Sequence, residues 1–323
     1  MNFWKELPKP FFALAPLEDV TDAAFRRLVA ECGKPDVTFT EFTSADGLLL
    51  ADANGKRRLE KKLSFCGIER PIVAQLFTAA PEHMEKAARL CAALQFDGID
   101  INMGCPDRSV EKSGCGAALI KTPEKARELI RAAARAGLPV SLKTRLGYDK
   151  DELETWLPEL LAEEPAAITI HARTRREMSD VPARWERIAR AVEIRDEAGA
   201  STLIIGNGDV RDLEDARAKA IETKCDGIML GRAIFGNPWL FAARDALPAP
   251  RERLEALARH LQLFDEILGD THYAVMKKHF KAYVSGWSGS KELRAQLMST
   301  HTAADAISLL QKGREIIQSC SVA

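Results

Sequence analysis

Two glycine-rich segments in the second half of the chain have the composition of a phosphate-binding site. The first is Gly206-Asn207-Gly208-Asp209 and the second is Gly231-Arg232, and each closes a short apolar run. A backbone without a Cβ atom can approach a phosphate closely and offer its N–H groups beside a helix start. Arg232 would add a charge-assisted hydrogen bond. The two segments therefore predict a ligand that carries a phosphate.

Short clusters that contain polar side chains also lie at or just after the ends of the earlier apolar runs. Their members are Pro16, Leu17 and Glu18, then Gln75, then Asn102 and Cys105, then Lys143 and Arg145, and then His171 and Arg173. A thiol has an ordinary pKa of about 8.5, so it is mostly protonated at neutral pH and can act as a general acid. Taken alone, Cys105 would more often be an inert buried thiol, and His171 could as well be a structural histidine. The place of Cys105 inside the segment Asn102-Met103-Gly104-Cys105-Pro106 and the position of His171 after an apolar run favour a function.

Eight short runs of apolar or β-branched residues predict the strands that must position these groups. The runs cover residues 11–15, 37–42, 72–77, 98–102, 139–143, 166–170, 202–206 and 226–230. Helical periodicity separates most of them, with Asp22, Ala80-Pro81, Thr122-Pro123 and Asp212 as helix starts. Alternating strands and helices favour parallel pairing, and eight such pairs close a (β/α)8 TIM barrel. The polar residues would then meet on the rim where such barrels hold their active sites.

The sequence after residue 244 predicts a different structure. Leu247-Pro248-Ala249-Pro250 is typical of a linker. Beyond it, helical spacing relates Leu254, Leu257, Ala258, Leu261, Phe264 and Leu268, and a second stripe relates Met276, Phe280, Tyr283, Val284 and Trp287. We therefore expect a catalytic barrel over residues 1–244 and a small all-helical domain over residues 245–323.

Composition excludes several classes of protein. The 323 residues are 46% hydrophobic and 29% charged, as in an ordinary globular protein, and the formal net charge of -1 gives no overall basic character. No apolar run approaches the roughly 18 residues of a membrane span, so a cytoplasmic protein without membrane contact is expected. The seven cysteines are scattered without a C-x-x-C pair, so neither disulfides nor a metal site is expected. Nothing in the sequence predicts an oligomeric state.

The rim residues resemble the motifs of the FMN-dependent, bacterial-type tRNA-dihydrouridine synthase family, and they occur in the same order. The matching segments are Ala15–Asp22, Asn102-Met103-Gly104-Cys105-Pro106, Ser113–Leu119, Lys143-Thr144-Arg145, His171–Thr174, Gly206–Asp209 and Gly231-Arg232. The Asn-x-Gly-Cys-Pro segment is the most specific of them. Leu17 departs from the methionine that is common in the family.

The resemblance implies roles for individual residues. Pro16, Leu17 and Glu18 would lie under the flavin, with Gln75 at a polar edge, Lys143 near N1 and O2, and His171 against flavin or uracil. Asn207, Gly208, Asp209, Gly231 and Arg232 would hold the FMN phosphate. Cys105 would give a proton to uracil C5 while reduced FMN gives a hydride to C6. Asn102, Arg145 and Arg173 would hold the nucleotide, and NADPH would be the transient reductant.

The resemblance also implies tRNA as the partner, although the sequence supports the RNA surface least directly. Between residues 271 and 314 there are seven basic residues and two acidic ones. Lys277, Lys278 and Lys281 would share one helix face and could neutralise RNA phosphates. Such a face is also typical of a simple solvated helix.

Two other functions remain open from the sequence. A flavin-dependent dehydrogenase or reductase of a free pyrimidine would share the lysine, the phosphate site and the thiol, but would need no RNA-binding helices. A non-catalytic tRNA-binding protein would need the helices alone. The presence of Cys105, Lys143 and His171 together argues against the second alternative.

Overall fold

A computed structural model describes residues 2–242, 244 and 248–320, with the side chains of the last helix described up to Lys312. By their packing, these residues form two compact units. The first contains residues 2–16, 36–64 and 70–231, and the second contains residues 17–35 and 65–69 together with the described residues from 232 to 320. The predicted boundary after residue 244 adjoins positions 243 and 245–247, which lie outside the described residues, so that boundary stays a prediction.

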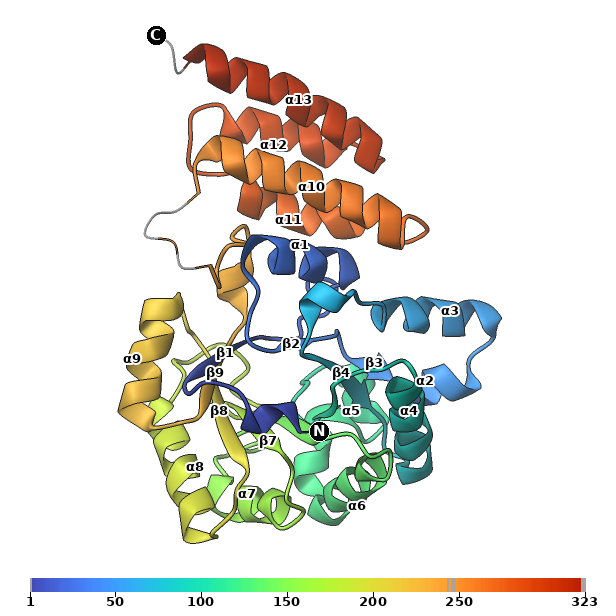
Figure 1. The fold of residues 1–323 in the computed structure, drawn as a ribbon, viewed down its shortest axis with the longest axis vertical. Coiled ribbons are helices and arrows are strands. Elements are labelled where there is room, and N and C mark those ends of the chain that lie inside the picture. The colour runs from blue at the N-terminus through green and yellow to red at the C-terminus, as the bar shows by residue number, and fades with distance from the viewer. Residues whose placement is uncertain (1, 243, 245–247, 321–323) are drawn as a thin grey trace. The chain divides into compact units, whose positions relative to one another are not determined.

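A closed parallel β-barrel forms the first unit (Figure 1). Its strands are β1 (Phe11–Leu14), β2 (Thr38–Phe39), β3 (Thr43–Ser44), β4 (Ile72–Phe77), β5 (Gly98–Asn102), β6 (Val140–Arg145), β7 (Ala167–His171), β8 (Leu203–Asn207) and β9 (Gly227–Leu230). They pair in the order β1-β9-β8-β7-β6-β5-β4-β2. The hydrogen bond from Leu14 N to Val37 O, 3.1 Å long, joins the two ends of this path. The predicted barrel is confirmed, and most predicted runs agree with an observed strand to within one or two residues. The run 37–42 differs more, because it contains only the two-residue β2, and β3 follows it; both strands pair with β4.

Helices follow most of the strands. They are α1 (Ala23–Gly33), α2 (Ala45–Leu50), α3 (Ala53–Lys62), α4 (Pro81–Ala93), α5 (Arg108–Lys112), α6 (Pro123–Ala134), α7 (Leu153–Leu161), α8 (Trp185–Glu197) and α9 (Leu213–Thr223). The predicted starts are confirmed. The Asp22 carboxylate accepts a hydrogen bond from Phe25 N, the Asp212 carboxylate accepts one from Asp215 N, and Pro81 and Pro123 begin α4 and α6.

The second unit is helical, as the sequence predicts. Its main helices are α10 (Pro250–Leu268), α11 (Ala274–Tyr283), α12 (Ser290–Ser299) and α13 (Ala303–Cys320), and α1 packs against α10 (Figure 1). Every member of the predicted stripe on α10 is buried, and so are Met276, Phe280, Tyr283 and Val284. Trp287 lies beyond α11 and is only half-buried. Pro250 is the first residue of α10 and not part of a linker, because proline is well tolerated at the first helical position.

Two buried histidines, His260 on α10 and His279 on α11, pack together in the core of the second unit. Their ring centroids are 4.6 Å apart, and both rings lie against Phe25 of α1. None of their four ring nitrogens has a hydrogen-bond partner in the described part of the chain. Burial lowers the pKa of His279 to about 4, with a smaller effect of Lys278. Both rings are therefore neutral in the folded protein at pH 7.

The His279→Leu variant is expected to resist acid better than the parent. The folded-state pKa of His279 lies below the unfolded value of about 6.5, so its contribution to stability is complete above that pH and is lost as pH falls toward 4. At pH 5 the loss is about 2 kcal/mol. The measurement is urea unfolding between pH 7.5 and 5, with His301→Leu as the control at an exposed histidine.

Asp22 has the opposite effect on the pH dependence of stability, because burial raises its pKa to about 6. Its contribution to the free energy of unfolding is lost as pH rises through that value. Asp22 is present in parent and variant alike, so the difference between them isolates His279. Equal pH slopes for the two proteins would contradict the expectation.

Candidate active site

Strand register brings five of the predicted site residues of the barrel together. Asn102 pairs with Lys143, Arg145 pairs with His171, and His171 pairs in turn with Asn207. These residues therefore form a continuous arc on the carboxyl ends of β5 to β8. Such an arc on one rim is the arrangement that barrel enzymes use for catalysis.

Hydrogen bonds join three buried side chains near the start of this arc, those of Gln75, Asp100 and Asn102. The Gln75 amide donates to the Asp100 carboxylate at 2.7 Å, and the Asn102 amide donates to Gln75 Oε1 at 3.0 Å. The Ser141 hydroxyl also donates to Asp100, at 2.6 Å. Burial raises the pKa of Asp100 to about 6. Sequence analysis missed Asp100, although a carboxylate inside the buried run 98–102 was a signal that could have found it.

The loop that carries Cys105 is held by backbone contacts on both sides of the residue. Asn102 Oδ1 accepts hydrogen bonds from Gly104 N at 3.2 Å and from Cys105 N at 2.9 Å, and Cys105 O accepts one from Ala117 N at 3.0 Å. Gly116 has φ +60, and a Cβ atom there would lie 2.7 Å from Cys105 O. Only glycine fits this position without moving the loop.

Cys105 itself is half-buried at the rim. Burial raises the pKa of its thiol above the ordinary value, and the nearby charges of Lys143 and Arg145 offset only part of that effect. The thiol is therefore protonated at neutral pH. A protonated thiol on a catalytic rim can donate a proton to a bound substrate.

Lys143 is a desolvated cation at the end of β6. In the described part of the chain its ammonium forms no hydrogen bond or ion pair. Burial lowers its pKa to about 8, with a further contribution from the charge of Arg145. A cation in this state can stabilise negative charge that develops on a ligand.

Arg145 is buried and contacts backbone carbonyls. Its Nε donates to Gly104 O at 2.8 Å, and its Nη1 donates to Thr174 O at 3.1 Å and to Met178 O at 3.3 Å. Burial lowers its pKa to about 10, so the guanidinium stays charged at neutral pH. These contacts join the Cys105 loop to the loop after β7. Arg145 therefore stabilises the arrangement of these two loops at the rim.

Arg173 and Asp209 form an ion pair, with Arg173 buried. The same Asp209 carboxylate accepts a hydrogen bond from Ala183 N at 3.0 Å. Arg173 Nη1 is buried and has no hydrogen-bond partner among the described residues. Because a buried donor without a partner is costly, this atom fits a site for an acceptor that the chain does not itself supply.

Close packing requires a glycine directly after β8, at Gly208. Gly208 has φ +132, and a Cβ atom there would lie 2.9 Å from Ala183 Cβ. Trp185 Nε1 donates to Gly208 O at 3.0 Å, and Asn207 Nδ2 donates to Met229 O at 2.8 Å. The side chain of Asn207 is therefore engaged in joining β8 to β9, and the segment offers mainly backbone to a ligand.

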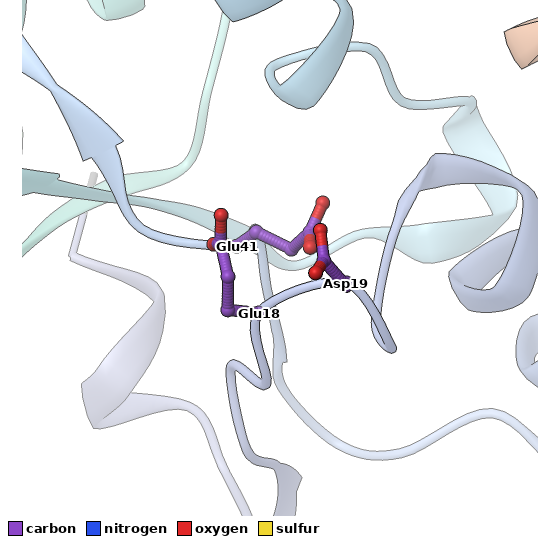
Figure 2. A group of neighbouring side chains, drawn as sticks. All are labelled: Glu18, Asp19 and Glu41. Carbon is purple, nitrogen blue, oxygen red and sulfur yellow. The ribbon is translucent and has the colours of Figure 1, made fainter. Parts of the chain in front are cut away.

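The remaining predicted residues of the barrel motifs follow its first strand, β1, and its last strand, β9. Pro16 is buried, Leu17 is half-buried, and Glu18 is exposed beside Asp19 on the turn after β1 (Figure 2). Gly231 is half-buried, and the exposed Arg232 follows it directly. By packing, Leu17, Glu18 and Arg232 belong to the second unit.

The three lysines of α11 lie on one side of the helix, as predicted. Lys278 and Lys281 are exposed and Lys277 is half-buried, whereas Met276 and Phe280 on the other side are buried. Two of the three ammonium groups have partners within the second unit. Lys277 donates to Met298 O at 2.8 Å, and Lys278 pairs with Asp19 at 2.7 Å.

Sequence analysis also missed an ion pair beside the Cys105 loop. Arg175, on the loop after β7, pairs with Glu111 of α5. The two residues are 64 positions apart in the sequence and lie outside the motifs named above, so no local pattern relates them. In the described part of the chain, no helix is both long and apolar enough to cross a membrane.

Comparison with solved structures supports the fold. Histamine dehydrogenase from Rhizobium sp. 4-9 aligns with a TM-score of 0.51 at 14% identity, over 78% of this chain and 48% of that chain. A 2-naphthoyl-CoA reductase in complex with 2-naphthoyl-CoA aligns with a TM-score of 0.52 at 11% identity, over 71% of this chain and 49% of that chain. At such identities the likeness shows a shared fold alone.

Comparison of sequences goes further. A probable tRNA-dihydrouridine synthase 2 from Bacillus subtilis (strain 168) is 45% identical over 312 residues, which are 96% of this chain and 95% of the relative. A probable tRNA-dihydrouridine synthase from Staphylococcus epidermidis is 44% identical with the same coverage. The family model described as dihydrouridine synthase matches residues 13–320. Since both matches span nearly the full chain, the protein is a member of the dihydrouridine synthase family.

Proposed function

We propose that this protein is a flavin-dependent oxidoreductase that reduces the C5=C6 bond of uridines in tRNA, with FMN as its bound flavin and Cys105 as the proton donor. The observation that carries this proposal is the rim itself. A protonated thiol, on Cys105 just after β5, and an ammonium that forms no ion pair with the described residues, on Lys143 of β6, lie at the carboxyl ends of neighbouring strands. The names of the relatives support tRNA as the substrate.

The residues of the rim fit FMN. Lys143 offers a cation for the pyrimidine side of the flavin, where charge accumulates on reduction. Gly208, where close packing allows only glycine, and Gly231 would offer backbone N–H groups to the phosphate, and Arg232 would complete the site. The buried Nη1 of Arg173, which has no hydrogen-bond partner among the described residues, adds a donor. Pro16, Leu17, Glu18, Gln75, His171, Asn207 and Asp209 would complete the cofactor site.

The chain's own residues would supply the proton and the orientation of the substrate. Reduced FMN, when bound, supplies a hydride to uracil C6. The Cys105 Sγ–H bond breaks as its proton passes to C5, which leaves a thiolate that takes up a proton from solvent. Asn102 holds the backbone of Cys105 in place through its amide oxygen. Asn102, Arg145 and Arg173 would also hold the nucleotide.

NADPH would return the flavin to its reduced form. Reduction of the flavin by NADPH requires no dinucleotide-binding motif, because the nicotinamide would contact only transiently the face of the flavin that uracil uses. The experiment compares the rates at which NADPH and NADH bleach the flavin absorbance of the purified protein. A much faster rate with NADH would contradict the choice of NADPH.

The helical residues 245–323 would bind tRNA, and the barrel over residues 1–244 would carry the chemistry. A uridine inside folded RNA cannot reach a recessed flavin, so the base must leave its stack and enter the pocket. Lys277, Lys278 and Lys281 would contact phosphates of the same tRNA. The cytoplasmic location stays a prediction.

The double variant Lys277→Glu with Lys281→Glu is expected to weaken tRNA binding by about tenfold at low salt, because it replaces two cations near the phosphates by anions. The slope of log affinity against log salt should also become shallower. Binding is measured by filter retention at several salt concentrations. Flavin oxidation by small acceptors should be unchanged.

A matched control for this variant is Lys86→Glu with Lys125→Glu. These lysines are exposed on α4 and α6 of the barrel, so the net charge changes by the same amount. The control should bind tRNA almost as the parent does. Equal losses in both variants would assign the effect to overall charge and remove the proposed face on α11.

The proposed function is tested with purified protein, NADPH and tRNA that lacks dihydrouridine. We expect a yellow protein whose flavin is FMN, and dihydrouridine formed in the tRNA. Free uracil should not be reduced. Reduction of uracil in place of tRNA would favour the free-pyrimidine enzyme, and tRNA binding without any reduction would favour the non-catalytic protein.

A further inference from the structure

The loop that carries Cys105 is bound by an arginine on each side. Arg145 Nε donates to the carbonyl of Gly104 at 2.8 Å, immediately before Cys105. Arg175 Nη2 approaches the carbonyl of Pro106 at 3.5 Å, immediately after it. One contact comes from the end of β6 and the other from the loop after β7, so they limit the movement of the cysteine from both sides.

Arg175 is itself held by a carboxylate. Its Nε donates to Glu111 Oε1 at 2.8 Å, and its Nη2 donates to the other carboxylate oxygen, which makes a two-point ion pair. The side chain of Glu111 is only 10% exposed and that of Arg175 is 24% exposed. A partly buried, bidentate pair of this kind is stronger and more directional than an exposed one.

The position of Glu111 connects this ion pair to the cysteine. Glu111 lies in α5, the short helix that begins three residues after Cys105 and is capped by Asp107. Arg175 lies on the loop after β7, whose backbone is joined to the loop after β6 by hydrogen bonds from Arg175 N to Gly147 O and from Arg176 N to Tyr148 O. The Arg175–Glu111 pair therefore ties the segment that follows Cys105 to the fixed part of the rim.

We propose that Arg175 and Glu111 are positioning residues that hold the Cys105 thiol in the orientation needed for proton transfer to uracil. This inference rests on the proposed function. The two residues act through the Cys105 loop and need not touch the substrate. A displacement of about 1 Å at a reacting group can cost up to about 10²-fold in rate, so a loss of this restraint is measurable.

The competing role for Arg175 is direct contact with an RNA phosphate. A substitution at Glu111 distinguishes this role from the positioning of Cys105. If Arg175 bound RNA, removal of the neighbouring carboxylate would leave the affinity for RNA unchanged or raise it. If the pair positions Cys105, Glu111→Gln and Arg175→Gln must have the same effect. Their double variant should then be no slower than either single one, because both changes break one interaction.

The test uses the flavin-loaded full-length protein and two readouts. The first is the single-turnover rate of uridine reduction in tRNA, together with the tRNA dissociation constant. We expect Glu111→Gln and Arg175→Gln each to lower the rate by about tenfold while the dissociation constant stays within about twofold. A parental rate for Glu111→Gln combined with weaker tRNA binding by Arg175→Gln would overturn the proposal.

The second readout does not depend on catalysis. It is the rate at which neutral iodoacetamide alkylates Cys105, followed by mass spectrometry of the peptide. A loosened loop should change this rate at least threefold in both variants, and a parental alkylation rate would overturn the proposal. A parent protein that forms no dihydrouridine would refute the proposed function instead, and the alkylation rates would still decide the restraint.

Two further variants guard against a general loss of stability. Arg187→Gln breaks an ion pair with Asp151 on the same barrel, and Arg187 is also 24% exposed. Arg187→Gln should lower the melting temperature about as much as Glu111→Gln and Arg175→Gln do. It should change neither the rate of uridine reduction nor the rate of Cys105 alkylation. Arg175→Lys keeps the charge but loses the two-point geometry, so it should give an intermediate loss if Arg175→Gln fails to fold.

Discussion

The Cys105→Ala variant is expected to reduce uridine about 10²–10⁴ times more slowly than the parent, with its flavin still bound, because it lacks the general acid. Burial raises the pKa of this thiol, so the parent keeps its proton at neutral pH. Alanine leaves the backbone contacts of Asn102 and Ala117 to residue 105 intact. The measurement is the rate of dihydrouridine formation in tRNA, with flavin absorbance as the check on cofactor content.

Cys115→Ala is the matched control for this prediction. Cys115 is a buried thiol ten residues further along the chain, and its pKa is also raised by burial. It should retain most of the activity. Undiminished turnover by Cys105→Ala would remove Cys105 from the acid role, and equal losses in both variants would point to damage to the loop.

The Lys143→Met variant is expected to lose about 10²–10³-fold in uridine reduction, the effect typical of removing one group that stabilises developing charge. Methionine preserves most of the side-chain length and removes the cation. The FMN content should also fall, since the ammonium would contact the flavin. Titration of the apoprotein with FMN and the single-turnover rate measure the two effects separately.

The pH dependence of the parent gives an independent check on Lys143. Its pKa is lowered to about 8, so the ammonium is charged below that pH and becomes neutral above it. A step that needs this charge should slow as pH rises through about 8. Lys143→Met should lack that decline, and a parental pH profile in the variant would assign the decline to another group.

Much of the barrel could be predicted because each strand is a short apolar run between helix start signals. The predicted runs 72–77 and 98–102 match β4 and β5 residue for residue. The run 37–42 was predicted as one strand, whereas only Thr38–Phe39 (β2) pairs with β4 inside it, and a second short strand, β3, pairs with β4 just beyond it at Thr43–Ser44. Local hydrophobicity does not encode such an interruption, since it depends on pairing with a distant strand.

Residue types and their order along the chain predicted polar residues at the ends of the strands, and strand pairing brings Asn102, Lys143 and His171 to one rim. A backbone demand such as φ +132 at Gly208 is visible in the sequence because few residues other than glycine adopt it. The tertiary structure alone decided what the long polar side chains contact. Arg145 reaches three carbonyls on two loops, and Arg175 reaches a carboxylate 64 residues away. The packing of α1 against α10 is likewise set in three dimensions. The physical reason is that ion pairs and helix packing join residues distant along the chain, whereas strand, helix and turn preferences act between neighbours.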